Sequence, residues 1–132
     1  MPAPDETVNA YIAMWNTSDR EQQEALAQQT LSEDAVLLYP TFEAHGRVDA
    51  VAAAERFQRD TPGIRIARRS GVEQHHGWIR VAWRIVLPDG SVVTEGQSVG
   101  QLAADGRLRR VTGFRDPLPL SDDQARSEEG DH

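Results

Sequence analysis

Residues 77–116, GWIRVAWRIVLPDGSVVTEGQSVGQLAADGRLRRVTGFRD, decide the fold of this chain. Two turn signals, Asp89-Gly90 and Asp105-Gly106, separate three runs rich in β-branched and aromatic residues. Asp-Gly between such runs is a strong signal for a β-hairpin, so the segment predicts an antiparallel meander. The three expected strands are Trp78–Leu87, Ser91–Leu102 and Arg107–Asp116.

The expected strands are about ten residues long, whereas five or six is usual. Long strands twist and coil, so a sheet built from them curves and has a concave side. Alternation along the first strand places Arg80, Ala82 and Arg84 on the outer face. The opposite, inward-facing set is Val81, Trp83, Ile85 and Leu87.

The chain before the meander carries three helix signals. The first helix has Asp5 as its expected N-cap and runs to about Trp15, because four apolar residues recur there at helical spacing. A capping-box pattern, Ser18 with Glu21, opens the second. The apolar residues of the first helix are Val8, Tyr11, Ile12 and Trp15. The second and third helices are expected at Asp19–Gln29 and Arg47–Arg59, the third with Val48, Val51, Ala54 and Phe57 toward the core.

Two further strands are expected between the helices and the meander. Ala35–Tyr39 is short and ends at Pro40, because proline breaks a strand. Ile64–Gln74 has a possible break at Ser70-Gly71, and Thr41–Gly46 is expected to be a loop. Helices followed by a mainly antiparallel sheet predict an α+β fold with the helices on one face.

Length and composition indicate one domain, residues 1–120, followed by an acidic tail, 121–132, that we expect to be disordered. The net charge of −7 argues against nucleic acid as the main partner. The chain contains neither cysteine nor lysine, which excludes thiolate and Schiff-base chemistry. It has no long apolar run and no signal-peptide pattern, so we expect a cytoplasmic protein that does not bind a membrane.

The order helix–helix–strand–helix–meander, together with four short motifs, resembles the NTF2-like superfamily and its SnoaL-like branch. The motifs are residues 11–19 (YIAMWNTSD), 31–36 (LSEDAV), 45–50 (HGRVDA) and 104–108 (ADGRL), the last leading to 113–116 (GFRD). The resemblance covers nearly all of the chain up to Asp116. It implies a cone-shaped curved antiparallel sheet, covered by three N-terminal helices, that encloses a pocket. It also implies a homodimer through the sheet, and it places the chain near polyketide cyclases and relatives of ketosteroid isomerase, which use no cofactor.

Only some of the catalytic residues of ketosteroid isomerases have a counterpart in this chain. Their oxyanion-stabilising tyrosine, late in the first helix, corresponds to Tyr11. Their general-base aspartate stands before a proline at the end of the first strand, where this chain has Tyr39. Their protonated aspartate in the middle strand corresponds to the region Gln97-Ser98. Because a phenol with a pKa of about 10 is a poor base at neutral pH, we do not expect steroid-type isomerisation.

SnoaL-like cyclases use an aspartate just after the last strand as general acid/base, and Asp116 matches that place. Phe114 and Trp83 could supply the apolar wall that raises the pKa of such a carboxyl. The alternative for Asp116 is a turn residue before Pro117. Tyr11 and Tyr39 could polarise a carbonyl, or could be core tyrosines with satisfied hydroxyls.

Other residues complete the candidate site. His45 could be a donor at the pocket mouth or an ordinary surface histidine. The residues expected to shape the pocket are Trp15, Phe57, Trp83, Gln97 and Phe114. His75 and His76 should diverge in their turn, so we expect no metal site.

Three functions remain open at this point. The first is a cofactor-independent cyclase or isomerase in which Asp116 moves a proton next to a carbonyl and Tyr11 or Tyr39 stabilises the enolate. The second is a non-catalytic module that binds a small apolar or carbonyl-containing molecule or a protein. The third is a dimerisation domain whose sheet pairs with a second copy.

Overall fold

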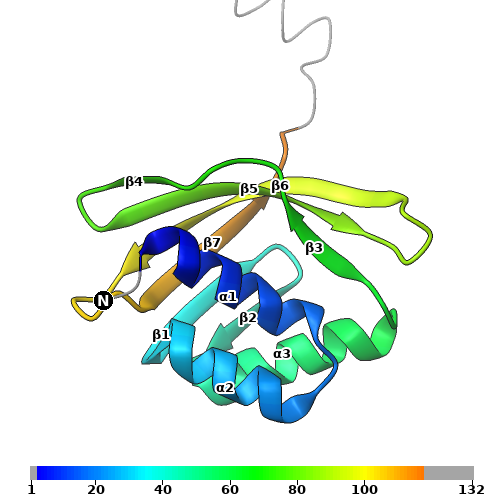
Figure 1. Ribbon diagram of the computed structural model, residues 1–132, viewed down its shortest axis with the longest axis horizontal. Helices are drawn as coiled ribbons and strands as arrows, with labels where there is room; N and C mark the ends of the chain where they lie inside the picture. Colours follow the sequence, from blue (N-terminus) through cyan, green and yellow to red (C-terminus); the bar gives the residue numbers. More distant parts are fainter. Residues whose placement is uncertain (1–2, 118–132) are drawn as a thin grey trace, which may run out of the picture.

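The computed structural model describes residues 3–117, so the expected tail 121–132 lies outside the described residues. The chain forms three helices and one seven-stranded sheet (Figure 1). Six of the strands lie in the order β2-β1-β7-β6-β5-β3, and the seventh, β4, pairs with β5. The helices are α1 (Pro4–Asn16), α2 (Arg20–Thr30) and α3 (Gly46–Asp60). The strands are β1 (Leu31–Tyr39), β2 (Phe42–His45), β3 (Arg65–Arg68), β4 (Glu73–His75), β5 (Trp78–Val86), β6 (Val92–Leu102) and β7 (Leu108–Arg115).

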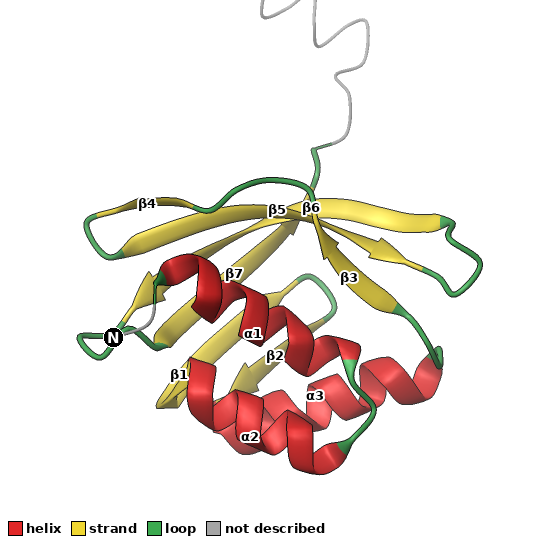
Figure 2. Cartoon of the chain, viewed as in Figure 1, coloured by secondary structure: helices red, strands yellow, loops and turns green. Residues whose placement is uncertain are grey.

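The sheet is curved, and all three helices lie on its concave side (Figure 2). The meander β5–β6–β7 is antiparallel, whereas β1 runs parallel to β7, because the chain returns to the sheet through α3 and the strands that follow. The expected α+β fold, with a mainly antiparallel curved sheet under three helices, is confirmed.

One part of the sheet differs from expectation. The expected loop at 41–46 is mostly strand β2, which folds back on β1 with Tyr39 opposite Phe42. The pattern of β2 fits a strand, because Ala44 is buried while its neighbours are exposed. The expected strand Ile64–Gln74 is broken around Ser70-Gly71, where a break was considered possible, into β3 and β4, which pair with different parts of β5.

The helix ends also shift. The N-cap of α1 is Ala3 rather than Asp5, because Pro4 occupies the first turn, where its missing N–H costs nothing. Val48 was expected in the core, but it is 81% exposed. The buried stripe of α3 passes through Ala50 and Ala54, and Val48 lies off that stripe at helical periodicity.

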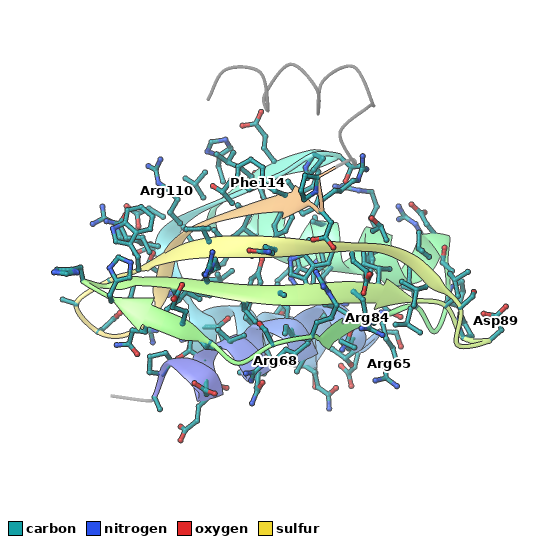
Figure 3. The ribbon with its side chains drawn as sticks, turned by 90° about the horizontal axis from the view of Figure 1, so that it is seen from above. Arg65, Arg68, Arg84, Asp89, Arg110 and Phe114 are labelled. Carbon is teal, nitrogen blue, oxygen red and sulfur yellow. The ribbon has the colours of Figure 1, made fainter. Side chains whose placement is uncertain are left out.

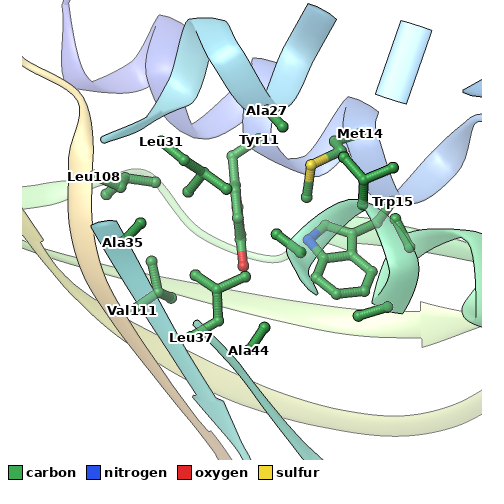
Figure 4. Packing of buried hydrophobic residues seen from close by; sticks show 14 of the residues in the cluster. Tyr11, Met14, Trp15, Ala27, Leu31, Ala35, Leu37, Ala44, Leu108 and Val111 are labelled. Atoms are coloured by element: carbon green, nitrogen blue, oxygen red, sulfur yellow. The ribbon is translucent and has the colours of Figure 1, made fainter. Parts of the chain in front are cut away.

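Two side-chain amides fix the C-terminal end of α1 against the sheet. Asn16 bonds both backbone groups of Ile66, accepting from its N–H at 2.7 Å and donating to its carbonyl at 2.9 Å. The buried amide of Gln58 donates to the carbonyls of Trp15 (2.6 Å) and Ile64 (2.8 Å). These bonds hold Trp15 in the apolar core between the helices and the concave face, part of which is drawn in Figure 4.

Candidate functional site

An apolar cavity of about 250 Å³ lies between α1, the second half of α3 and the concave face of the sheet. Its walls include the expected residues Trp15, Phe57 and Trp83 together with both tyrosines. The aromatic rings contact one another, since Trp15 meets Tyr11, Tyr39 and Phe57 edge-on at 5.8–6.2 Å between ring centroids. Whether these residues bind a ligand stays a prediction, but the structure brings them together.

Glycines on the concave face make room for the large rings. A Cβ at Gly96 would come within 2.7 Å of two carbons of the Trp83 ring, and a Cβ at Gly113 would collide with the ring of Tyr39. Glycine in a strand interior often marks such a close approach. The two rings therefore lie against bare backbone on β6 and β7.

Two tyrosine hydroxyls meet in the cavity wall. The phenolic oxygens of Tyr11 and Tyr39 are 2.7 Å apart. Burial raises the pKa of both phenols; for Tyr39 the hydrogen bonds with Tyr11 and Ser98 partly offset this effect. Both side chains are therefore neutral hydrogen-bond donors at physiological pH. Only one of the two hydrogens can lie in the bond between them, so the other can be donated to a further acceptor, either Ser98 or a bound molecule.

Two tryptophan N–H groups lie in the same wall. The indole of Trp83 donates to the Ser98 hydroxyl at 2.8 Å. The buried indole N–H of Trp15 has no hydrogen-bond partner among the described residues. In Figure 4 its nitrogen lies on the edge of the ring that faces Tyr11, and the Trp15 indole lowers the pKa of Tyr11 somewhat against the larger effect of burial. A buried donor without an acceptor is costly, so this corner of the cavity favours an oxygen acceptor.

Asp116 lies outside this cavity wall. Its two carboxylate oxygens are each 3.1 Å from Nη2 of Arg69, and Asp116 is not among the residues that line the cavity. Arg69 also donates to the backbone carbonyls of Trp83 (3.0 Å) and Gly96 (3.1 Å). The structure therefore presents Asp116 as one partner of an ion pair that ties the C-terminal end of β7 to β5 and β6.

Three other candidates lie away from the cavity. Gln97 and Phe114 are opposite each other on the outer face of β6 and β7, and Phe114 is 60% exposed. Their expected place in the pocket wall is wrong, because the inward positions of these strands belong to Ser98 and Gly113. His45 is the exposed N-cap residue of α3, with Nε2 2.8 Å from Glu43, and does not reach the pocket mouth.

The histidine turn also differs from expectation. His75 and His76 do not diverge, since their Nδ1 atoms are 3.1 Å apart. Within residues 3–117, no three potential ligand side chains gather closely enough to hold a metal ion. No helix in the described range is long and apolar enough to cross a membrane.

Ser98 and Arg115 are among the lining residues that sequence reasoning did not place in the pocket. Ser98 follows Gln97, the predicted pocket residue, in the sequence, and the alternation of side chains along a strand allowed either of the two to face inward. Arg115 lines the cavity, although no role was assigned to it from the sequence. A charged residue at the end of a strand gives no apolar signal, so the pattern of the sequence did not reveal it.

A solved structure is similar to this chain over most of its length. It is an inferred isomerase of the SnoaL-like family from Agrobacterium tumefaciens, with a TM-score of 0.80 and 29% sequence identity, covering 85% of this chain and 96% of that one. The chain has the NTF2-like fold in its SnoaL-like form.

Other SnoaL-like and NTF2-like structures share the fold at lower identity. An NTF2-like protein from Exiguobacterium has a TM-score of 0.68 at 18% identity, covering 85% of this chain and 99% of that one. An inferred SnoaL-like polyketide cyclase from Jannaschia has a TM-score of 0.61 at 16% identity, covering 88% and 90%. No protein-family model matches the sequence, and no curated protein matches it.

Proposed function

We propose that this SnoaL-like protein binds a small, largely apolar molecule that carries a carbonyl or similar oxygen acceptor. The observation that carries the proposal is a surplus of donors in an apolar cavity. The Tyr11–Tyr39 pair has two phenolic hydrogens for the one bond between the two oxygens, and the buried indole N–H of Trp15 has no hydrogen-bond partner among the described residues.

The chemistry of the wall favours a ligand that is apolar apart from such an oxygen. Aromatic and aliphatic side chains form most of the surface, and a volume of about 250 Å³ suits a small molecule. A hydrogen-bonding site of this kind rejects analogues that lack the acceptor, because their binding leaves buried polar groups unpaired. Selectivity for a ketone over a hydrocarbon of the same shape is therefore expected.

Proton transfer next to the bound carbonyl is the second candidate function. It is favoured by the similarity to an inferred isomerase at 29% identity, and the two phenols would stabilise an enolate oxygen. The reaction needs a base, and the cavity lining within residues 3–117 contains neither a carboxylate nor a histidine. Asp116, the expected acid/base, lies outside the lining and is paired with Arg69, so proton transfer is proposed here as a candidate beside binding.

The test is a ligand-induced shift in melting temperature. Rigid cyclic ketones are compared with hydrocarbons of the same carbon skeleton, using the wild type and Tyr39→Phe, which keeps the ring on Gly113. A ligand at 100 times its Kd adds about 2.7 kcal/mol of stability. We expect ketones to stabilise the wild type more than the hydrocarbons do, and this preference to fall in Tyr39→Phe. Equal shifts for ketone and hydrocarbon in the wild type would contradict the proposal.

Catalysis is tested separately by deuterium exchange at the carbon next to the ketone, followed by NMR. Exchange that is accelerated by the wild type and lost in Asp116→Asn would establish proton transfer. Binding without accelerated exchange would leave the protein as a binding module.

A homodimer through the sheet is a further proposal, which follows from the SnoaL-like resemblance. The outer face seen in Figure 3 carries Arg84, Arg110 and the exposed ring of Phe114. Light scattering coupled to size exclusion measures the oligomeric state directly. A dimer that dissociates in Phe114→Glu would support this use of the outer face, and a monomeric wild type would contradict it.

A further inference from the structure

One end of the cavity is more exposed than the other. Lining residues Ile79, Val81, Leu108 and Val111 are buried, whereas Pro40, Thr41, Val93 and Arg115 are exposed. The exposed set lies where β1 and β7 end and β6 begins. We call this end, defined by Pro40, Thr41, Val93 and Arg115, the mouth of the cavity.

Arg115 is the one charged residue among the described residues that line the cavity. Strand alternation explains its position. In β7 the inward positions are Val111, Gly113 and Arg115, while Arg110 and Phe114 face outward (Figure 3). Arg115 therefore extends from the same face of the sheet that supports the Tyr39 ring.

The acidic residues nearest Arg115 in the sheet have other partners. Asp116 is held by Arg69 at 3.1 Å, and Glu95 lies 3.3 Å from Arg84 and 3.4 Å from Arg69. Within residues 3–117, Arg115 forms neither an ion pair nor a side-chain hydrogen bond. Its guanidinium therefore has no polar partner within this part of the chain. The planar set of N–H donors of an arginine matches the two oxygens of a carboxylate.

We propose that the ligand of this cavity is an apolar acid, with its carboxylate or similar anionic group at Arg115 and its carbonyl at the tyrosine pair. The inference deepens the proposed function and rests on it. The hydroxyls of Thr41 and Thr94, which also line the cavity, can donate to the same anion.

The geometry limits the length of this ligand. Gly113, which lies against the Tyr39 ring, and Arg115 are two residues apart on one strand, so their Cα atoms are about 7 Å apart. Because the two polar groups extend from neighbouring positions of the lining, a short carbon skeleton suffices to join them against the apolar wall. The class of ligand is therefore an oxo acid of modest size, rather than a neutral polycyclic ketone.

The experiment compares an aromatic oxo acid with its primary amide by isothermal titration calorimetry on the full chain. We expect the acid to bind the wild type about tenfold more tightly than the amide, as one charge-assisted contact at a partly exposed site allows. Arg115→Gln should abolish this preference. Arg110→Gln is the matched control, because it removes the same charge from the outer face of the same strand and should keep the preference.

The outcomes separate this inference from the proposed function. Equal binding of acid and amide to the wild type, or a preference for the acid that survives Arg115→Gln, would contradict only the proposed contact between Arg115 and an anionic group of the ligand. The proposed function would still stand if both compounds bind and both lose affinity in Tyr39→Phe. If neither compound binds, and ketones give no melting shift, the proposed function fails and this inference fails with it.

Discussion

The indole ring of Trp83 lies directly against Gly96, its partner across strands β5 and β6. A Cβ at Gly96 would come within 2.7 Å of two ring carbons, a distance that requires the ring or the strand to move. The indole N–H donates to Ser98 two residues along the same strand. Trp83 is thus held flat on the concave face, where it forms one wall of the cavity.

Gly96→Ala should therefore destabilise the protein. The added methyl group meets both the Trp83 ring and the backbone of β7, and overpacking of this kind costs about 1–3 kcal/mol. Urea denaturation measures the change. Gly71→Ala is the control, because a Cβ there meets nothing within 4 Å, and its effect should stay within about 0.5 kcal/mol. Equal stability of the two variants would show that the ring does not rest on Gly96.

The tyrosine pair predicts an unusual alkaline titration. The chain has two tyrosines, Tyr11 and Tyr39, so the phenolate absorbance of the whole protein reports on this pair. Burial raises the pKa of both in the folded state. Their stabilising contribution is complete below the unfolded pKa of about 10 and is lost as the pH rises further.

We therefore expect little phenolate in the folded protein at pH about 10, where a free tyrosine is half ionised. Phenolate should appear at higher pH together with the loss of the folded circular dichroism signal. The same chain in denaturant, titrated in parallel, is the control. Half-ionisation near pH 10 without unfolding would mean that the two hydroxyls are open to water.

Arg69 should stabilise the sheet far more than a surface arginine does. Its side chain is 21% exposed and contacts Asp116, Glu95 and two backbone carbonyls. Arg69→Gln should cost about 1–3 kcal/mol, because hydrogen bonds to charged groups are lost. Arg80→Gln, which breaks an exposed pair with Glu73, is the control and should cost about 0–1 kcal/mol. A similar small effect in both variants, measured by urea denaturation, would contradict a structural role for Arg69.

Local signals in the sequence were enough for the meander and for part of the site. The Asp-Gly turns and the alternation of Val81, Trp83 and Ile85 predicted the long strands and the inner face of β5. Phe114 was assigned wrongly because of an irregularity in β7. Leu102 pairs with Leu108 but Gln101 pairs with Arg110, so one extra residue shifts the alternation. Counting inward positions by two from Leu108 reaches Phe114, whereas the strand turns Arg115 inward.

The inner face of β6 could not be predicted for a different reason. Its inward residues are small, namely Gly96, Ser98 and Gly100, while Val99 faces outward. Apolar patterning therefore points to the wrong face of this strand. The inward positions are small because rings from other elements fill the space above them, and such a packing relation between distant segments has no local signal.

Gln58 offers a test of how Trp15 is held in the cavity wall. Its buried Nε2 donates to the carbonyls of Trp15 and Ile64. In Gln58→Glu at neutral pH, a carboxylate faces two carbonyl oxygens, and in the control Gln58→Met the same carbonyls lose their donor without gaining a charge. Each lost partner costs about 1–3 kcal/mol, and the buried charge adds to this cost in the glutamate variant. Burial raises the pKa of that glutamate above its unfolded value of about 4.3. The variant is therefore most stable at low pH, where the glutamate is protonated, and it loses stability as the pH rises.

We therefore expect the difference in unfolding free energy between Gln58→Glu and Gln58→Met, measured by urea denaturation, to narrow as the pH falls from about 7 to about 4. A gap that does not change with pH would show that the side chain at position 58 turns to solvent and does not hold Trp15.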